Sequence, residues 1–131
     1  MLEDKSKKKA LVTGATRGIG LSVAKRLLKD NIEVISTGTK HNGLHAEGSS
    51  YLQVDFLDKN STEEFLRVIK DEPIDILVNN AGINRIDKFT EIKEQDFDEI
   101  LQVNLKAPFL IAQTVIKNMQ LKNWGRVINI A

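Results

Sequence analysis

The sequence contains no cysteine, which excludes a disulfide framework, a thiolate nucleophile and a thiolate metal site. Its 19 basic and 18 acidic residues leave a net charge of +1, so no excess of charge favours nucleic acid or an anionic membrane as partner. It also lacks an apolar run long enough to span a bilayer, and residues 1–9 lack the apolar core of a signal peptide. We therefore expect a cytoplasmic protein without nucleic-acid or membrane partners.

The length of 131 residues suits one domain, and a composition of 41% hydrophobic and 28% charged residues is that of a globular protein. No internal repeat or Pro/Ser-rich linker divides the chain, so we predict a single domain over residues 1–131. The basic run Lys7–Lys9 is interpreted as a solvated lead-in to the first strand rather than a nucleic-acid patch.

Short apolar runs rich in β-branched residues alternate with segments of helical period. Several of these runs are apolar at successive positions, as strands covered on both faces are. The five predicted strands are Ala10–Thr13, Glu33–Thr37, Tyr51–Asp55, Ile74–Val78 and Arg126–Ile130. Alternation of strands and helices with short loops predicts an α/β domain with a parallel sheet and right-handed crossovers.

Three helical regions separate the predicted strands. The first has an apolar stripe over Ile19–Leu27, and the second opens on an S-x-x-E capping box, Ser61–Glu64. The third begins near Glu94 and contains Pro108, which lacks a backbone N–H. We expect Pro108 to bend or loosen this helix near Asn104.

A glycine-rich loop joins the first strand to the first helix. Glycine allows positive φ, and the absence of side chains lets a diphosphate approach the N–H groups at a helix N-terminus. The loop is not a P-loop, because neither Gly14 nor Gly18 begins a G-x-x-x-x-G-K-[ST] pattern. The predicted cofactor-binding residues in this loop are Gly14, Ala15, Thr16, Arg17, Gly18, Ile19 and Gly20.

Four segments, in order, resemble the short-chain dehydrogenase/reductase family. They are the T-G-x-x-x-G-x-G loop Thr13–Gly20, the N-N-A-G segment Asn79–Gly82, Val103–Leu105, and the strand Gly125–Ala131. The resemblance implies a nicotinamide-dinucleotide-binding Rossmann-type fold, a doubly wound parallel sheet in three α/β/α layers. It also implies that strands one to five are present and that later strands are missing.

The second strand lacks the acid that bonds the ribose 2′-OH of NAD(H) in such folds. Gly38 occupies that position, and no carboxylate lies between Glu33 and Glu47. Arg17 and Lys40 offer cations for an adenosine 2′-phosphate, and Thr39 offers a hydroxyl. Arg17 is the first choice because guanidinium matches phosphate bidentately, whereas Lys40 is equally explained as a solvated loop charge. We predict NADP(H) as the cofactor rather than NAD(H).

The resemblance assigns further cofactor contacts after the third and fourth strands. Asp55 would accept from the adenine amino group with Phe56 beside the ring, although Asp55 is also explained as a solvated strand-end carboxylate. Asn80, Ala81 and Gly82 would lie against the nicotinamide ribose. Asn79 and Asn80 are alternatively explained as hydrogen-bonding ties between loops, and we expect some of both.

Only one catalytic residue implied by the resemblance falls on this chain, Asn104, which would help to relay protons through water. Its alternative role is to hold the helix bend above Pro108 by donating to a freed carbonyl. The family's serine and its Tyr-x-x-x-Lys pair are expected beyond Ala131, because the sole tyrosine, Tyr51, is followed four residues later by Asp55. We therefore expect a truncated chain, inactive alone, whose last strand forms an open apolar edge prone to association.

The leading hypothesis is an NADP(H)-dependent oxidoreductase acting on a small-molecule carbonyl or acyl-carrier-linked substrate. Among subgroups the chain most resembles 3-oxoacyl-[acyl-carrier-protein] reductases, and the full-length form is expected to be a homo-oligomer. One alternative is a non-catalytic dinucleotide-binding module or sensor. Another is an S-adenosylmethionine methyltransferase, which the missing acid at Gly38 disfavours. His41 and His45 flank a glycine in a loop, and we predict no metal site there.

Overall fold

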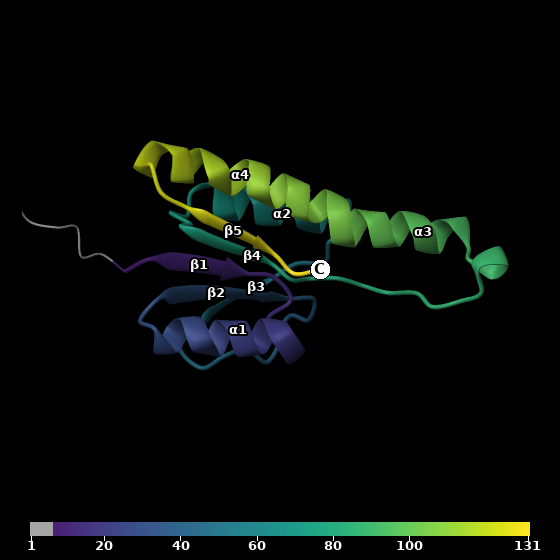
Figure 1. Ribbon diagram of the computed structural model, residues 1–131, viewed down its shortest axis with the longest axis horizontal. Coiled ribbons are helices and arrows are strands. Elements are labelled where there is room, and N and C mark those ends of the chain that lie inside the picture. Colours follow the sequence, from purple (N-terminus) through teal and green to yellow (C-terminus); the bar gives the residue numbers. More distant parts are fainter. Residues whose placement is uncertain (1–6) are drawn as a thin grey trace, which may run out of the picture.

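The fold is a five-stranded parallel sheet with helices on both faces, seen in a computed structural model that describes residues 7–131 (Figure 1). Residues 1–6, part of the segment from which the absence of a signal peptide was predicted, lie outside the described residues. The strands are β1 (Lys9–Val12), β2 (Glu33–Gly38), β3 (Ser50–Gln53), β4 (Ile76–Asn79) and β5 (Arg126–Asn129). Their order, β3-β2-β1-β4-β5, confirms the predicted α/β parallel sheet and makes β3 and β5 the two edges.

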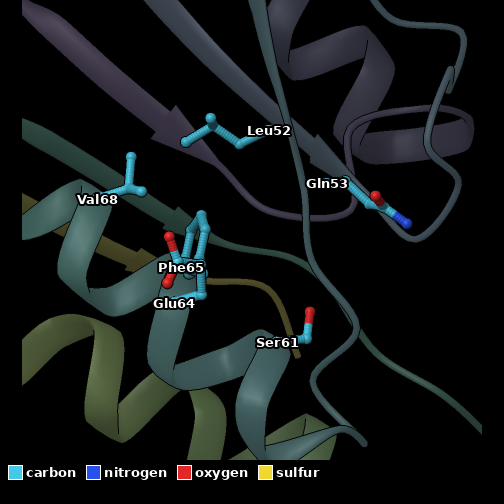
Figure 2. Close-up of a pocket in the computed structure, with 6 residues that line it drawn as sticks. All are labelled: Leu52, Gln53, Ser61, Glu64, Phe65 and Val68. Atoms are coloured by element: carbon cyan, nitrogen blue, oxygen red, sulfur yellow. The ribbon is translucent and has the colours of Figure 1, made fainter.

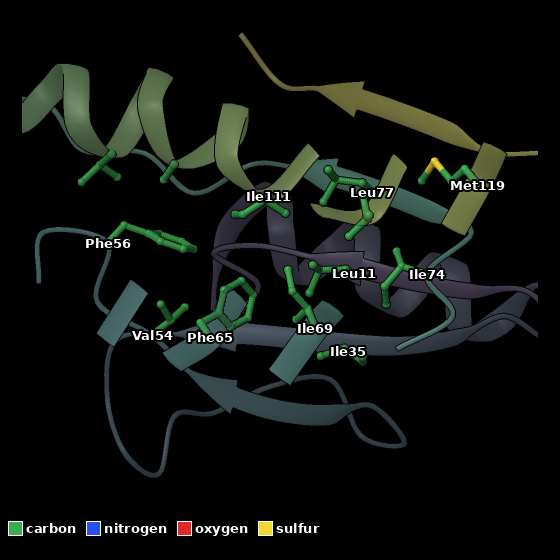
Figure 3. Close-up of a cluster of buried hydrophobic side chains, with 13 residues drawn as sticks. Leu11, Ile35, Val54, Phe56, Phe65, Ile69, Ile74, Leu77, Ile111 and Met119 are labelled. Atoms are coloured by element: carbon green, nitrogen blue, oxygen red, sulfur yellow. The ribbon is translucent and has the colours of Figure 1, made fainter. Parts of the chain in front are cut away.

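Helices cover the sheet from opposite sides. Helix α1 (Gly18–Lys29) lies on one face, and α2 (Lys59–Lys70) and α4 (Ala107–Lys122) lie on the other (Figure 1). The α2/α4 side encloses the larger apolar cluster, which includes Leu11, Leu77 and Ile111 (Figure 3). Alternate residues of β1, such as Ala10 and Val12, belong to the second cluster on the α1 side. These two apolar layers explain why the central strands are apolar at successive positions.

The long third helical region contains a change of period where Pro108 was expected to act. Helix α3 (Glu94–Leu101) passes into a π-helical segment, η2 (Gln102–Lys106), and then into α4. Pro108 lies in the first turn of α4, where its missing N–H cannot bond the carbonyl of Asn104. The prediction of a loosened helix at Asn104 is confirmed, and the irregularity is a π turn.

The N-terminus of α2 differs from the predicted capping box. The helix begins at Lys59, and Asp58 is the N-cap residue, with its Oδ1 accepting the N–H of Ser61 at 2.8 Å. The Ser61 hydroxyl instead accepts the N–H of Asp55 at 2.9 Å. Glu64 pairs with Arg67 rather than returning to the cap. The capping box was therefore wrong, because an aspartate one turn earlier already caps the helix.

Candidate coenzyme-binding site

The glycine loop joins β1 to α1 at the carboxyl edge of the sheet, and two of its glycines have left-handed backbones. Gly14 has φ of +62° and Gly18 has φ of +56°, a region that costs other residues roughly 1–2 kcal/mol. A side chain on Gly14 would place its Cβ 2.9 Å from the Cα of Ala81, whereas a Cβ on Gly18 would meet nothing within 4 Å. Gly14 therefore allows the loop to pack closely against Ala81, and Gly18 leaves open space at the start of α1.

Hydrogen bonds fasten this loop to the end of β2. The N–H of Ala15 donates to the Thr37 carbonyl at 2.9 Å, and that of Gly14 donates to the Thr37 hydroxyl at 3.2 Å. Arg17 is the N-cap residue of α1, and its side chain makes no capping bond. The N–H groups in the first turn of α1 thus follow a loop held in place by hydrogen bonds, and the Arg17 side chain does not cap them. This arrangement suits the binding of an anion.

The same loop is bound to the segment after β4. The hydroxyl of Thr13 accepts the N–H groups of Asn80 and Ala81, both at 3.0 Å. In return, the Asn80 side-chain amide donates to the carbonyls of Thr13 at 3.2 Å and Gly14 at 3.0 Å. A Cβ on Gly20 would lie 2.5 Å from the Asn80 amide nitrogen, so this glycine permits close packing of the helix start. We call this set of bonds the Thr13–Asn80 clasp.

The four-residue N-N-A-G segment therefore has at least one structural role. The Asn79 amide donates to the Asn129 side chain at 3.0 Å, which ties β4 to β5. The Asn79 Oδ1 is buried and has no hydrogen-bond partner among the residues that the structure describes. The Asn80 side chain is held in the clasp, which leaves the ribose contact predicted for Asn80, Ala81 and Gly82 to the backbone and the small side chains. Gly82 lies beside Asn104, whose Oδ1 would be 3.3 Å from a Cβ at this glycine.

Exposed polar groups lie where the adenosine end of a dinucleotide is expected. Arg17, Thr39 and Lys40 are exposed, and neither of the two cations forms an ion pair with a residue in the described range 7–131. Asp55 is also exposed, and its Oδ1 accepts the N–H of Leu57 at 3.0 Å. No side chain can be added at Gly38 without displacing a neighbour, because its Cβ would lie 2.5 Å from Thr16 Cγ2. Arg17, Thr39 and Lys40 therefore remain predicted contacts for a 2′-phosphate.

Phe56 is placed differently from its prediction. Its side chain is 6% exposed and packs edge-on against Phe65, with ring centroids 5.7 Å apart (Figure 3). Its carbonyl accepts the Gln102 side-chain amide at 3.3 Å. The ring therefore belongs to the core and does not lie beside an adenine at the surface. Sequence reasoning missed this because Phe56 follows Asp55 directly, and neighbouring residues point in different directions.

Asn104, the predicted catalytic residue, is bound to the segment after β4 through both ends of its amide. Its Oδ1 accepts the N–H of Ile83 at 2.8 Å, and its Nδ2 donates to the Ile83 carbonyl at 2.9 Å. The side chain thus does not donate to a carbonyl freed by Pro108, which corrects that alternative. It fixes the π turn next to Gly82, within the candidate site.

Tyr51 was excluded as a catalytic residue, and the structure places it beside Lys40 and Gly38. Its hydroxyl donates to the Lys40 carbonyl at 2.5 Å, and its ring stacks on His45 with centroids 5.2 Å apart. Burial raises the pKa of Tyr51, and a hydrogen bond with the Gly43 backbone lowers the pKa by a smaller amount. No sequence motif signals this contact, because it depends on the path of the loop after β2.

A cavity of about 230 Å³ lies apart from the glycine loop, between β3 and α2 (Figure 2). Three of its six lining residues are apolar and three are polar, and the Glu64 carboxylate among them is paired with Arg67 at 2.8 Å. Figure 2 shows the Gln53 amide pointing away from Phe65 and Val68. Across residues 7–131, no three acidic or histidine side chains gather as metal ligands, and no helix is long and apolar enough to cross a membrane.

The residues at the carboxyl edge suit a dinucleotide on their own geometry. Within residues 7–131, Gly18 leaves an open position, α1 begins without a side-chain cap and Arg17 forms no ion pair. These groups offer space, N–H donors and charge for phosphate groups. The neighbouring strands β1 and β4 are followed by helices on opposite faces of the sheet (Figure 1). Open α/β sheets bind ligands at the carboxyl edge between two such strands.

Comparison with known proteins gives a consistent result. A family model described as short chain dehydrogenase matches residues 8–131. The 3-oxoacyl-[acyl-carrier-protein] reductase FabG of Haemophilus influenzae is 38% identical over 129 residues, which cover 92% of this chain and 53% of the relative. Gluconate 5-dehydrogenase of Gluconobacter oxydans is 36% identical over 133 residues, 93% of this chain and 52% of the relative.

A solved structure has the same fold. A short-chain dehydrogenase from Streptomyces avermitilis superimposes with a TM-score of 0.87 at 23% identity, over 98% of this chain and 50% of that one. The chain thus spans about half the length of the proteins that it matches.

Proposed function

The chain belongs to the short-chain dehydrogenase family, and we propose that it is the coenzyme-binding part of an NADP(H)-dependent oxidoreductase. The observation that carries the proposal is the glycine loop, with its open Gly18 and its uncapped helix start, fastened to β2 and to the segment after β4. When bound, the coenzyme supplies the hydride. The residues of this chain bind and orient it.

Each part of the site has a role in this function. The first-turn N–H groups of α1 would hold the diphosphate. Arg17 and Lys40 would bind the adenosine 2′-phosphate, with the Thr39 hydroxyl as a donor. Asp55 would accept from the adenine amino group. Asn104 would hold the π turn against Ile83, so that the backbone beside Gly82 faces the reacting end in a fixed geometry.

The substrate and the remaining catalytic groups are assigned by likeness to relatives. We place the serine and the Tyr-x-x-x-Lys pair of the family beyond Ala131, so the 131-residue chain alone should show no turnover. The 38% identity to a 3-oxoacyl-[acyl-carrier-protein] reductase favours a 3-oxoacyl thioester or a related small carbonyl compound. A non-catalytic dinucleotide sensor is the alternative, and activity of a longer chain would exclude it.

The full-length protein is proposed to be a homo-oligomer. Exposed apolar side chains recur at every fourth residue along α3, η2 and α4, at Phe97, Leu101, Leu105 and Phe109, which are 41–65% exposed. Residues at this spacing lie on one side of a helix, and an apolar stripe of this kind is typical of protein interfaces. Sedimentation of the longer chain, with and without Phe109→Lys, tests the proposal: the substitution should lower the oligomeric state.

Calorimetric titration with NADPH and NADH tests the coenzyme assignment. NADPH should bind more tightly, and Arg17→Ala should weaken NADPH binding by roughly tenfold or more, because a hydrogen bond to a charged group contributes about 1.5–3 kcal/mol. Binding of NADH should change little. Arg26→Ala is the matched control, since Arg26 lies within α1, the helix that Arg17 precedes, and pairs with Asp30. Tighter binding of NADH, with NADPH affinity unaffected by Arg17→Ala, would contradict the assignment.

A further inference from the structure

Two side chains of β3 hold the backbone that follows β2. Tyr51 donates its hydroxyl hydrogen bond to the Lys40 carbonyl at 2.5 Å, and Gln53 donates from its amide to the Thr39 carbonyl at 2.9 Å. Because Tyr51 and Gln53 are two residues apart, they point from the same face of the strand. The carbonyls of Thr39 and Lys40, two of the three residues proposed to meet the adenosine 2′-phosphate, are therefore both fixed from β3.

Tyr51 also occupies the space beside Gly38. A Cβ at Gly38 would lie 2.6 Å from the Tyr51 hydroxyl oxygen and 2.5 Å from Thr16 Cγ2, so any side chain there requires both neighbours to move. Gly43 faces the same hydroxyl and is equally obstructed. A carboxylate at Gly38, which would bond the ribose 2′-OH of NAD(H) and repel a 2′-phosphate, would therefore require the Tyr51 ring to shift.

The ring itself is held in place from its other side. His45 stacks on Tyr51 with an interplanar angle of 17°, and the His45 Nδ1 lies 2.9 Å from the Ser49 hydroxyl. Ser49 is in turn 3.0 Å from the hydroxyl of Ser36, which is fully buried in β2. The loop is therefore fastened to the sheet at both ends, at the Lys40 carbonyl and through His45.

We propose that Tyr51 is a positioning residue that sets the preference for NADP(H) over NAD(H) by fixing Lys40 toward the 2′-phosphate. The inference rests on the proposed function. Lys40 is exposed, and a long cation on a free loop would lose conformational entropy when it bound phosphate. Because Tyr51 already holds the Lys40 carbonyl, the backbone of the loop loses less conformational entropy when Lys40 binds phosphate. The resulting gain in affinity applies only to a ligand that carries the 2′-phosphate.

The test compares adenosine 2′,5′-bisphosphate with adenosine 5′-monophosphate, two ligands that differ by the 2′-phosphate. Tyr51→Phe removes only the hydroxyl and keeps the ring against His45 and Gly38. We expect its affinity for the bisphosphate, measured calorimetrically, to fall by roughly five- to tenfold, as for one lost hydrogen bond, with the monophosphate affinity unchanged. In a Lys40→Ala background, Tyr51→Phe should have little further effect, because it acts through Lys40.

The outcomes separate this inference from the proposed function. Equal loss for both ligands, or no loss for either, in a folded Tyr51→Phe protein would overturn the role of Tyr51 while leaving the coenzyme assignment intact. A full Tyr51→Phe effect that persists in the Lys40→Ala background would also overturn it, since the hydroxyl would then act elsewhere. A wild-type chain without preference for the bisphosphate would refute the NADP(H) assignment itself, and this inference with it.

Discussion

At the scale of single residues, Gly18 and Gly48 share a left-handed backbone and differ in location. Gly18 opens α1 at the carboxyl edge, and Gly48, with φ of +92°, precedes β3 at the opposite edge, where an added Cβ would lie 3.9 Å from Leu28. Alanine at either position has space but an unfavourable φ, which costs roughly 1–2 kcal/mol. The two substitutions therefore form a matched pair: both introduce the same backbone strain, but only Gly18→Ala lies in the candidate site.

We expect Gly18→Ala to weaken NADPH binding by roughly tenfold or more, because its methyl group points into the loop mouth where the diphosphate must approach the N–H groups. Gly48→Ala should leave binding unchanged while lowering stability by a similar amount. Calorimetric titration and chemical denaturation of both variants check this. Equal affinities in the two variants would show that Gly18 lies outside the binding site.

The raised pKa of Tyr51 predicts a dependence of stability on alkaline pH. Burial raises this pKa above the ordinary tyrosine value of 10.0, so the unfolded chain loses the proton first. The contribution of Tyr51 to stability should therefore be fully present below about pH 10 and fall as the pH rises toward the folded pKa. Ionisation also removes the hydrogen bond to the Lys40 carbonyl.

Tyr51 is the only tyrosine, so the ultraviolet absorbance of phenolate reports it alone. The folded protein should titrate at higher pH than the denatured one. Tyr51→Phe should lose stability less steeply than the wild type in this range. Lys9, whose pKa is raised mainly by its hydrogen bond with Glu72, titrates in the same range but does so in both proteins, so its effect cancels in the comparison. Identical slopes would contradict the prediction.

At the scale of the elements, the start of α2 depends on one aspartate. Asp58 accepts the Ser61 N–H at 2.8 Å, whereas Glu64 forms only an exposed pair with Arg67. Asp58→Ala should therefore lower the free energy of unfolding by about 1 kcal/mol, and Glu64→Ala by no more than a few tenths. Urea denaturation of the two variants measures the difference. A larger loss in Glu64→Ala would restore the capping box expected from the sequence.

The sequence predicts the elements well where the pattern is local, and less well where partners are distant. Apolar runs place the strands to within two residues, because both faces of the central strands are covered. The partner of Asn104 is Ile83, 21 residues away, and no periodicity reveals such a pair. The clasp is likewise invisible, although Thr13 and Asn80 both lie in recognised motifs. Tyr51 carried no motif, and its contacts depend on an irregular loop.

At the scale of the whole molecule, β5 is an edge strand with exposed apolar residues. Val127, Ile128 and Ile130 are 39%, 47% and 38% exposed, and β5 pairs only with β4 within the described part of the chain. An open edge with apolar side chains is a template for pairing with other chains. We expect the 131-residue polypeptide to associate through this edge as its concentration rises.

Ile128→Lys should reduce that association, measured by sedimentation velocity over a range of concentrations, because a charged side chain on the edge opposes pairing. Leu44→Lys is the matched control: Leu44 is 86% exposed but lies in the loop between β2 and β3. It removes an apolar side chain without altering an edge. A wild-type polypeptide that stays monomeric throughout would disprove the association.

The Thr13–Asn80 clasp has a consequence for how a bound nucleotide leaves. The two loops that it joins would bind the diphosphate and the nicotinamide ribose; the loop after β4 supplies the donors of the clasp, and the glycine loop supplies the acceptors. Neither loop can open alone without breaking hydrogen bonds to the other loop. The rates of amide hydrogen exchange at residues 14–18 and 80–82 should therefore rise together. The nucleotide would then dissociate from both loops in one concerted step, instead of leaving one loop first and the other later.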